Sequence, residues 1–140
     1  MGILRLVVLW VLSFIFTSII DVIWHLVIFG KLYSQGIKPL ARMSGDNLAF
    51  KAFPGILSQV LVVTCIVFLV LYKAQKGNFL EGALIGACAG VLAITVYGVT
   101  NYALFKDWGQ DLTILEVVWG PILGGLSGIF VAWTSTFILK

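Results

Sequence analysis

Two carboxylic acids stand inside stretches that are otherwise apolar, and a tryptophan follows each of them three residues later. These pairs are Asp21 with Trp24 and Glu116 with Trp119. At the centre of a transmembrane helix an acidic side chain costs roughly 2.5 to 3.5 kcal/mol, so such a residue marks either a functional site or a paired structural contact. Each acid must be protonated, paired with a cation or held by several hydrogen bonds. The chemistry that these pairs indicate is proton sharing or recognition of an ionisable group.

Further polar residues fall at matching depths in the other apolar segments. Counted inward from one end at about 1.5 Å per residue, a first layer lies roughly 6 Å deep and holds His25, Asn101 and Glu116. A second layer at roughly 10 to 12 Å holds Asp21, Tyr97 and Gln59. In the first segment the polar residues recur every four positions and share one helical face, namely Ser13, Thr17, Asp21 and His25. We therefore expect the acids to point into a helix bundle rather than at lipid.

These depths and faces predict one intramembrane polar centre. His25 is the only histidine in the chain, so we expect it to contact Glu116, with Thr100 and Asn101 donating hydrogen bonds. Apolar pockets with a few converging polar groups are the usual small-molecule sites. The predicted ligand-binding residues are Asp21, Trp24, His25, Tyr97, Thr100, Asn101, Glu116 and Trp119. The alternative is a buried hydrogen-bond network that fixes helix register, with the tryptophans serving as interfacial belt and core packing.

The composition places these residues in a membrane protein. Hydrophobic residues make up 61% of the 140-residue chain, whereas soluble domains have about 45 to 50%. A bilayer span needs about 20 mostly apolar residues, and four segments qualify: 4–29, 52–72, 79–105 and 112–139. The sequence therefore predicts a single all-α integral membrane domain over residues 1–140. We expect a four-transmembrane-helix bundle with both termini on the same side.

Small residues recur every four positions in the last two segments and predict close helix packing. They are Gly82, Gly86 and Gly90 in the third segment, and Gly120, Gly124, Gly128 and Ala132 in the fourth. If these segments form a hairpin that turns near Trp108, residues 82–90 stand level with residues 126–134. The partner of the stripe lies either within the chain, or in a homo-oligomer or a separate membrane subunit.

The charge pattern excludes some classes of function. The net charge is +3, but the basic residues flank the apolar segments, which indicates interfacial anchors in a lipid bilayer and no nucleic-acid surface. They lie at both ends of the spans, so the positive-inside rule does not choose an orientation. Residues 30–51 mix apolar and basic side chains, which fits a partly helical segment along the headgroups or an ordinary solvated loop. No metal-ligand spacing and no nucleophile motif is present, so no metal, cofactor or catalytic residue is predicted.

Several motifs resemble one known family. The strongest is the run Tyr97-Gly98-Val99-Thr100-Asn101-Tyr102-Ala103, followed by Trp108, Leu112-Thr113 and Glu116-Val117-Val118-Trp119-Gly120. Asp21-Val22-Ile23-Trp24 resembles the first-helix motif of that family, and Tyr33 with Asn47-Leu48 fits the loop between. The family consists of small bacterial inner-membrane proteins called domain of unknown function 2177. The resemblance spans nearly the whole chain.

The resemblance implies a four-helix, multi-pass protein of the bacterial inner membrane with an important polar motif. It implies no chemistry, because the family has no established activity. Two positions depart from the family pattern, which usually has an acid where this chain has Gly98 and a leucine where it has His25. Any proton-sharing arrangement of the family is therefore expected to be rewired here.

Three functions follow from these observations. The first is binding or carrying of a small lipophilic or ionisable molecule at the polar centre, which predicts a cavity open to lipid or to the nearer membrane surface. The second is a non-catalytic subunit or assembly factor of a membrane protein complex, which predicts a filled core and an exposed glycine face. The third is an intramembrane enzyme that uses a carboxylate and His25 as acid and base. We favour a non-catalytic function.

Overall fold

The computed structural model describes residues 2–45 and 47–140 as a chain that is almost entirely helical. Its segment η1 is a π-helical end of the first long helix, and η2 is a π-helical insertion between α4 and α5. In chain order the elements are α1 (Ile3–Val22), η1 (Ile23–Ile28), α2 (Gly30–Ile37), β1 (Met43–Ser44), β2 (Asn47–Leu48), α3 (Ala52–Lys73), α4 (Phe79–Gly90), η2 (Val91–Thr95), α5 (Val96–Leu104) and α6 (Gln110–Ile138).

Within the described residues, four helices are long and apolar enough to cross a membrane, as the composition predicts. The first joins α1 to η1 over Ile3–Ile28, and the third joins α4, η2 and α5 over Phe79–Leu104. The other two are α3 and α6. Large apolar side chains cover the outward faces, for example Leu26, which is 71% exposed, and Leu92, which is 70% exposed. Such surfaces suit lipid, and the predicted all-α membrane fold is confirmed.

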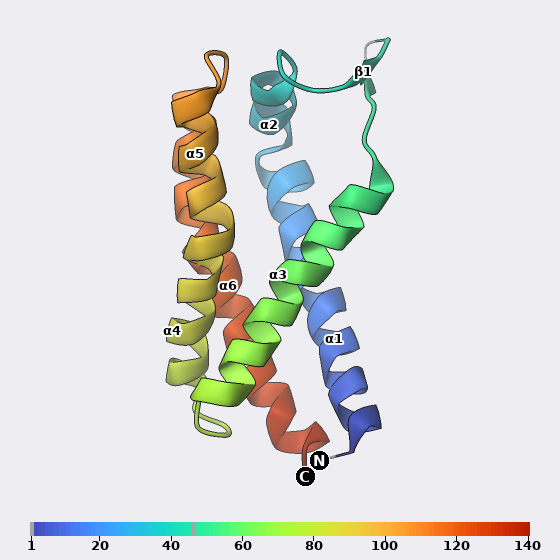
Figure 1. Ribbon diagram of the computed structural model, residues 1–140, viewed down its shortest axis with the longest axis vertical. Coiled ribbons are helices and arrows are strands. Elements are labelled where there is room, and N and C mark those ends of the chain that lie inside the picture. Colours follow the sequence, from blue (N-terminus) through green and yellow to red (C-terminus); the bar gives the residue numbers. More distant parts are fainter. Residues whose placement is uncertain (1, 46) are drawn as a thin grey trace.

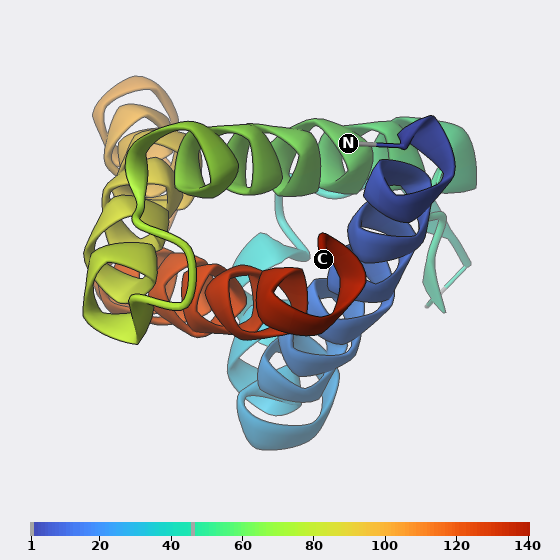
Figure 2. The same cartoon turned by 90° about the horizontal axis from the view of Figure 1, so that it is seen from below.

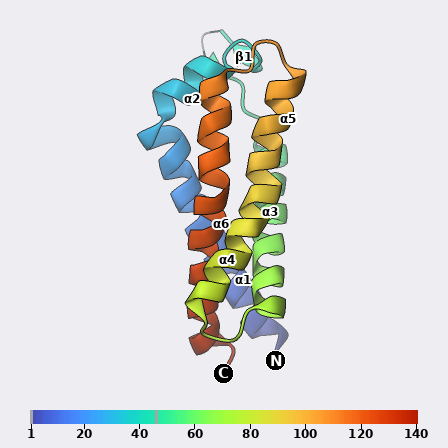
Figure 3. The same ribbon diagram turned by 90° about the vertical axis from the view of Figure 1, so that its left-hand side faces the viewer.

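The four long helices form an elongated bundle (Figure 1). Seen from below, α3 lies opposite α6, and α1 and α4 lie on the two remaining sides (Figure 2). α4 and α5 run beside α6 over most of its length (Figure 3). Both ends of the chain lie at the same end of the bundle (Figure 1). Their location on one side of a membrane stays a prediction.

The segment between the first two spans lies at the opposite end of the bundle from the chain ends (Figure 1). It begins with the short helix α2, whose Tyr33 is buried. It ends in a two-residue antiparallel ladder that pairs Met43 with Leu48 and Ser44 with Asn47. Part of the segment is therefore helical, and that part is anchored to the bundle by Tyr33.

The two glycine series of α4 and α6 lie against each other. A Cβ atom added to Gly82 would lie 2.7 Å from the Gly128 carbonyl oxygen, and one added to Gly120 would lie 2.8 Å from that of Gly90. Gly86 and Gly124 meet in the same way. The predicted register is wrong by about one helical turn, because residues 82–90 stand level with residues 120–132. The wider turn of η2, which a count along ideal helices omits, accounts for only part of this shift.

Apolar packing is concentrated near the end of the bundle that holds the chain ends. Leu9 of α1, Ile66 of α3 and Val131 of α6 are almost completely buried there. Farther along α1, the Thr17 hydroxyl donates a 2.9 Å hydrogen bond to Ser127 Oγ, and both side chains are 1% exposed. The polar face predicted for α1 therefore points into the bundle and continues toward Asp21.

Candidate functional site

The polar site begins where the first long helix changes from α to π geometry. Asp21 stands in the last turn of α1, and Trp24 and His25 belong to η1. The Phe29 amide donates to the Trp24 carbonyl, which closes a wider helical turn than an α-helix has. The His25 ring folds back on the preceding turn, so its Nδ1 lies 2.9 Å from the Asp21 carbonyl oxygen and 3.2 Å from Asp21 Oδ1.

His25 links the two carboxylates. Its Nε2 lies 3.7 Å from Glu116 Oε1 on α6, while its Nδ1 contacts Asp21. The Glu116 side chain is 7% exposed, whereas those of Asp21 and His25 are 25% and 30% exposed. The predicted contact between His25 and Glu116 is therefore present. The same imidazole ring also contacts Asp21, which the sequence places in the second layer, so it joins residues of both predicted layers in one cluster.

The two tryptophans complete the cluster, because each makes a contact with the other acid-x-x-tryptophan motif. Trp119 Nε1 donates a 2.8 Å hydrogen bond to Asp21 Oδ1, so the second motif's tryptophan binds the first motif's acid. The Trp24 and Trp119 rings stack with centroids 4.3 Å apart and an interplanar angle of 7°. Trp119 is 4% exposed. The indole pair therefore forms a wall beside the imidazole and the carboxylates.

Tyr33 also belongs to the cluster, although we did not include it among the predicted ligand-binding residues. Its ring centroid lies 4.4 Å from that of His25, and its hydroxyl oxygen lies 3.4 Å from Trp24 Nε1. Burial, followed by the negative charge of Glu116, raises the pKa of the Tyr33 phenol above its usual range. A signal was present in the sequence, since Tyr33 fits the same family pattern as the acid motifs. Tyr33 follows His25 by eight residues, and this spacing alone does not reveal that α2 folds back against η1.

The third helix contributes less than the sequence suggests. Tyr97 is 55% exposed and packs edge-on against Trp108, with ring centroids 5.8 Å apart. Thr100 is exposed and Asn101 is half-buried. Gly98 faces the cluster instead, and a Cβ atom on it would lie 2.5 Å from Glu116 Cβ. The extra residue of a π-helical turn changes the facing of every later residue, and η2 precedes all four positions.

A threonine in η2 supports the backbone of α6 next to Glu116. Pro121 lies inside α6 and has no amide hydrogen, so the Val117 carbonyl loses its normal helical donor. The Thr95 hydroxyl lies 3.3 Å from the Val117 carbonyl oxygen and 3.4 Å from that of Glu116. A hydroxyl from the neighbouring helix thus replaces the missing donor. Sequence periodicity does not indicate this contact.

Gln59, expected beside Asp21, keeps its Nε2 enclosed without a hydrogen-bond partner among the described residues. In residues 2–45 and 47–140, no group of three or more histidine, cysteine, aspartate or glutamate side chains is arranged to hold a metal ion. The assembled cluster comprises Asp21, Trp24, His25, Tyr33, Glu116 and Trp119. It provides two acids, one imidazole and an aromatic wall.

Comparison with known proteins gives one result that covers most of the chain. A family model described as predicted membrane protein (DUF2177) matches residues 6–133. No curated protein and no solved structure matches the chain. The matched range contains every residue of the cluster.

Proposed function

This chain belongs to the family of predicted membrane proteins called domain of unknown function 2177, and we propose its function from the residues of its own polar cluster. The protein binds or carries a small lipophilic molecule with a cationic or ionisable group. Asp21, His25 and Glu116 recognise the charged group, and Trp24 and Trp119 enclose the apolar part. The observation that supports this proposal is the contact of one imidazole with two carboxylates.

The charge of the cluster favours a cationic group on the ligand. When both acids are ionised and His25 is cationic, the three groups carry a formal charge of −1. An uncompensated charge in a medium of low dielectric constant is costly, and a bound cation removes that cost. Asp21 and His25 remain partly exposed, at 25% and 30% of their side-chain areas. A ligand therefore reaches these two groups more easily than Glu116.

The aromatic wall suits the same class of ligand. A cation near the face of an indole ring is attracted by the ring quadrupole, and the attraction is larger away from water. Trp24 is half-buried and stacks on the buried Trp119. The Tyr33 ring also contacts the imidazole, with centroids 4.4 Å apart. A lipophilic amine or quaternary ammonium group would find both charge and aromatic surface in this place.

The alternative role as a non-catalytic subunit or assembly factor lacks the surface on which it was based. That role called for an exposed glycine face, but Gly82, Gly86 and Gly90 pack against Gly120, Gly124 and Gly128 in the same chain. An intramembrane enzyme would need a substrate atom within reach of both His25 and an acid. The binding role requires these groups together with space for a ligand beside the partly exposed Asp21 and His25.

The proposal includes the membrane setting of the protein. We place it in the bacterial inner (cell) membrane as a single multi-pass domain, on the basis of the four spans and the family match. A homo-oligomer or an additional membrane subunit is compatible with this role. Fractionation of cells that express a tagged chain tests the location, and recovery with outer-membrane markers would contradict it.

Two ions of similar shape and opposite charge test the binding function. Tetraphenylphosphonium is a lipophilic cation and tetraphenylborate is the matching anion. Equilibrium dialysis of the purified protein in detergent should show saturable binding of the cation and none of the anion. Asp21→Asn and Glu116→Gln should each weaken cation binding by about tenfold, which corresponds to about 1.4 kcal/mol.

Glu81→Gln serves as the matched control, because Glu81 lies at the opposite end of the bundle and binds the Gln75 backbone. It should leave cation binding unchanged. Equal binding of both ions, or equal effects of all three variants, would contradict the proposal. If Asp21→Asn and Glu116→Gln unfold the protein while no cation binds the native chain, the cluster has a structural role only.

A further inference from the structure

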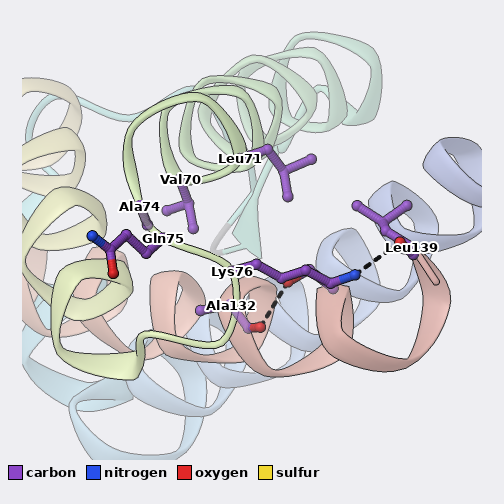
Figure 4. A pocket seen from close by; sticks show the side chains of 8 residues that line it. Val70, Leu71, Ala74, Gln75, Lys76, Ala132 and Leu139 are labelled. Carbon is purple, nitrogen blue, oxygen red and sulfur yellow. Dashed lines mark hydrogen bonds between the residues drawn. The ribbon is translucent and has the colours of Figure 1, made fainter. Parts of the chain in front are cut away.

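A cavity lies at the end of the bundle that holds the chain ends, far along the helices from the polar cluster. Its volume is about 200 Å³, and it opens between the last turns of α3 and α6 (Figure 4). Its apolar lining comes from Val70, Leu71, Ala74, Ala132 and Leu139. This end of α3 and α6 coincides with the ends of two candidate spans, which places the cavity at the level of the lipid headgroups.

One basic side chain stands at the mouth of this cavity. Lys76 is exposed, and its Nζ donates a 2.9 Å hydrogen bond to the Leu139 carbonyl oxygen (Figure 4). The same end of the bundle carries three further basic residues, Arg5, Lys73 and Lys140. Glu81 is the acidic residue among the described residues there, and the Gln75 amide donates a 2.6 Å hydrogen bond to it. The charge around the cavity is therefore predominantly positive.

An outward-facing apolar groove adjoins the cavity. It has a volume of about 350 Å³, lies between α1 and α3, and is lined by Trp10, Phe68 and Tyr72 among others. Leu71 lines both the cavity and the groove. The basic cavity and the apolar groove thus meet at one shared lining residue, Leu71.

We propose that this combined surface binds one anionic glycerophospholipid. The phosphate lies at Lys76, the glycerol region occupies the cavity, and one acyl chain passes Leu71 into the groove. Basic pockets between transmembrane helices bind anionic headgroups, and each basic residue near such a headgroup contributes attraction. The cavity is smaller than the roughly 300 to 1,000 Å³ of sites that enclose a whole small molecule, which suits the part of a lipid next to its headgroup.

Lipid binding to purified protein tests this proposal. Native mass spectrometry in detergent compares phosphatidylglycerol with phosphatidylcholine of the same acyl chains, and glycerol 3-phosphate serves as the headgroup without chains. Phosphatidylglycerol should bind in preference to the other two. Lys76→Gln should raise its dissociation constant about fivefold, as expected for about 1 kcal/mol per basic residue. Lys76→Arg keeps the charge and should keep the preference.

Lys106→Gln is the matched control, since Lys106 follows α5 at the other end of the bundle. It should leave the lipid preference unchanged. Leu71→Trp fills the junction of cavity and groove and should reduce binding of phosphatidylglycerol without affecting glycerol 3-phosphate. Equal affinity for both lipids, equally strong binding of glycerol 3-phosphate, or equal loss in Lys76→Gln and Lys76→Arg would overturn the proposal.

Discussion

The indole nitrogen of Trp119 donates a 2.8 Å hydrogen bond to the carboxylate of Asp21. Each of these residues belongs to a different acid-x-x-tryptophan motif, and they are 98 residues apart in the chain. The stacking of Trp24 on Trp119 makes a second contact between the same two motifs. The two motifs therefore form one unit that connects the end of α1 with α6.

Removal of this hydrogen bond should destabilise the protein. Trp119→Phe keeps an aromatic ring beside Trp24 but leaves Asp21 without the indole donor. We expect the free energy of unfolding to fall by about 1.5 to 3 kcal/mol, the usual value of a hydrogen bond to a charged group. Reversible unfolding in mixtures of mild detergent and dodecyl sulfate measures the change.

Trp133→Phe provides the control for this substitution. Trp133 is 48% exposed on the same helix, and its ring contacts Phe130 and Phe137. That variant should unfold at nearly the same dodecyl sulfate fraction as the original chain. If the two substitutions have equal effects, the bond to Asp21 does not contribute to stability.

The contact between α4 and α6 should distinguish two adjacent glycines. A Cβ atom on Gly124 would overlap the Gly86 carbonyl oxygen, whereas one on Gly125 would lie 3.6 Å from its nearest neighbour, the Ala83 carbonyl oxygen. Gly124→Ala should therefore separate the helices and lower the melting temperature. Gly125→Ala meets only ordinary contacts and should raise stability by about 0.5 to 1 kcal/mol, because alanine favours helix.

Thermal melting in detergent, with spin labels on α4 and α6 to measure their separation, tests both expectations. The Gly124→Ala variant should show a longer distance between labels, and the Gly125→Ala variant should show no change. If Gly124→Ala keeps the original distance and melting temperature, close packing of these glycines is not needed for the fold.

Local patterns in the sequence predict the spans and the polar face of the first helix. Apolar length identifies four long helices, and four-residue spacing places Thr17 and Asp21 on one inward face. The contact of His25 with Glu116 also follows from depth alone, since both lie near the same end of their helices. These properties depend on residues that are close in sequence or on distance along a straight helix.

The missed features depend on local departures from ideal helix geometry. The π-helical segment η2 turns Gly98 toward Glu116 and leaves Tyr97 exposed, and no residue type marks such a segment in the sequence. The return of α2 over η1 brings Tyr33 to His25, which hydropathy does not reveal. A helical wheel therefore predicts which face of α1 is polar but not which face of α5 meets the cluster.

The environment of Tyr33 should make the protein less stable at alkaline pH. Burial and the Glu116 charge raise the pKa of this phenol, while an unfolded tyrosine ionises near pH 10, about the value of a free side chain. The folded state therefore holds its proton more tightly than the unfolded state. Its contribution to stability is complete below about pH 10 and declines as the pH rises above that value.

Tyrosinate absorbance measures this effect directly. The chain has four tyrosines, and the step that titrates last should disappear in Tyr33→Phe. Glu116→Gln removes a negative charge and should move that step to lower pH. Stability above pH 10 should fall less in Tyr33→Phe than in the original chain. If the step at the highest pH keeps its midpoint and amplitude in Tyr33→Phe, that step does not belong to Tyr33, and the pKa of this phenol is not raised.

The hydroxyl of Thr95 should matter because Pro121 is present. Thr95→Val leaves the Val117 carbonyl without a donor and should lower the free energy of unfolding by about 1 kcal/mol. Pro121→Ala restores an amide hydrogen to that carbonyl, so the same threonine substitution should cost much less in the Pro121→Ala background. Thr136→Val is the control, since the Thr136 hydroxyl is exposed and bonds within its own helix turn. Unfolding in detergent and dodecyl sulfate of the original chain, the two single variants Thr95→Val and Pro121→Ala, and the double variant gives the coupling energy. A coupling energy near zero would show that Thr95 does not replace the missing donor.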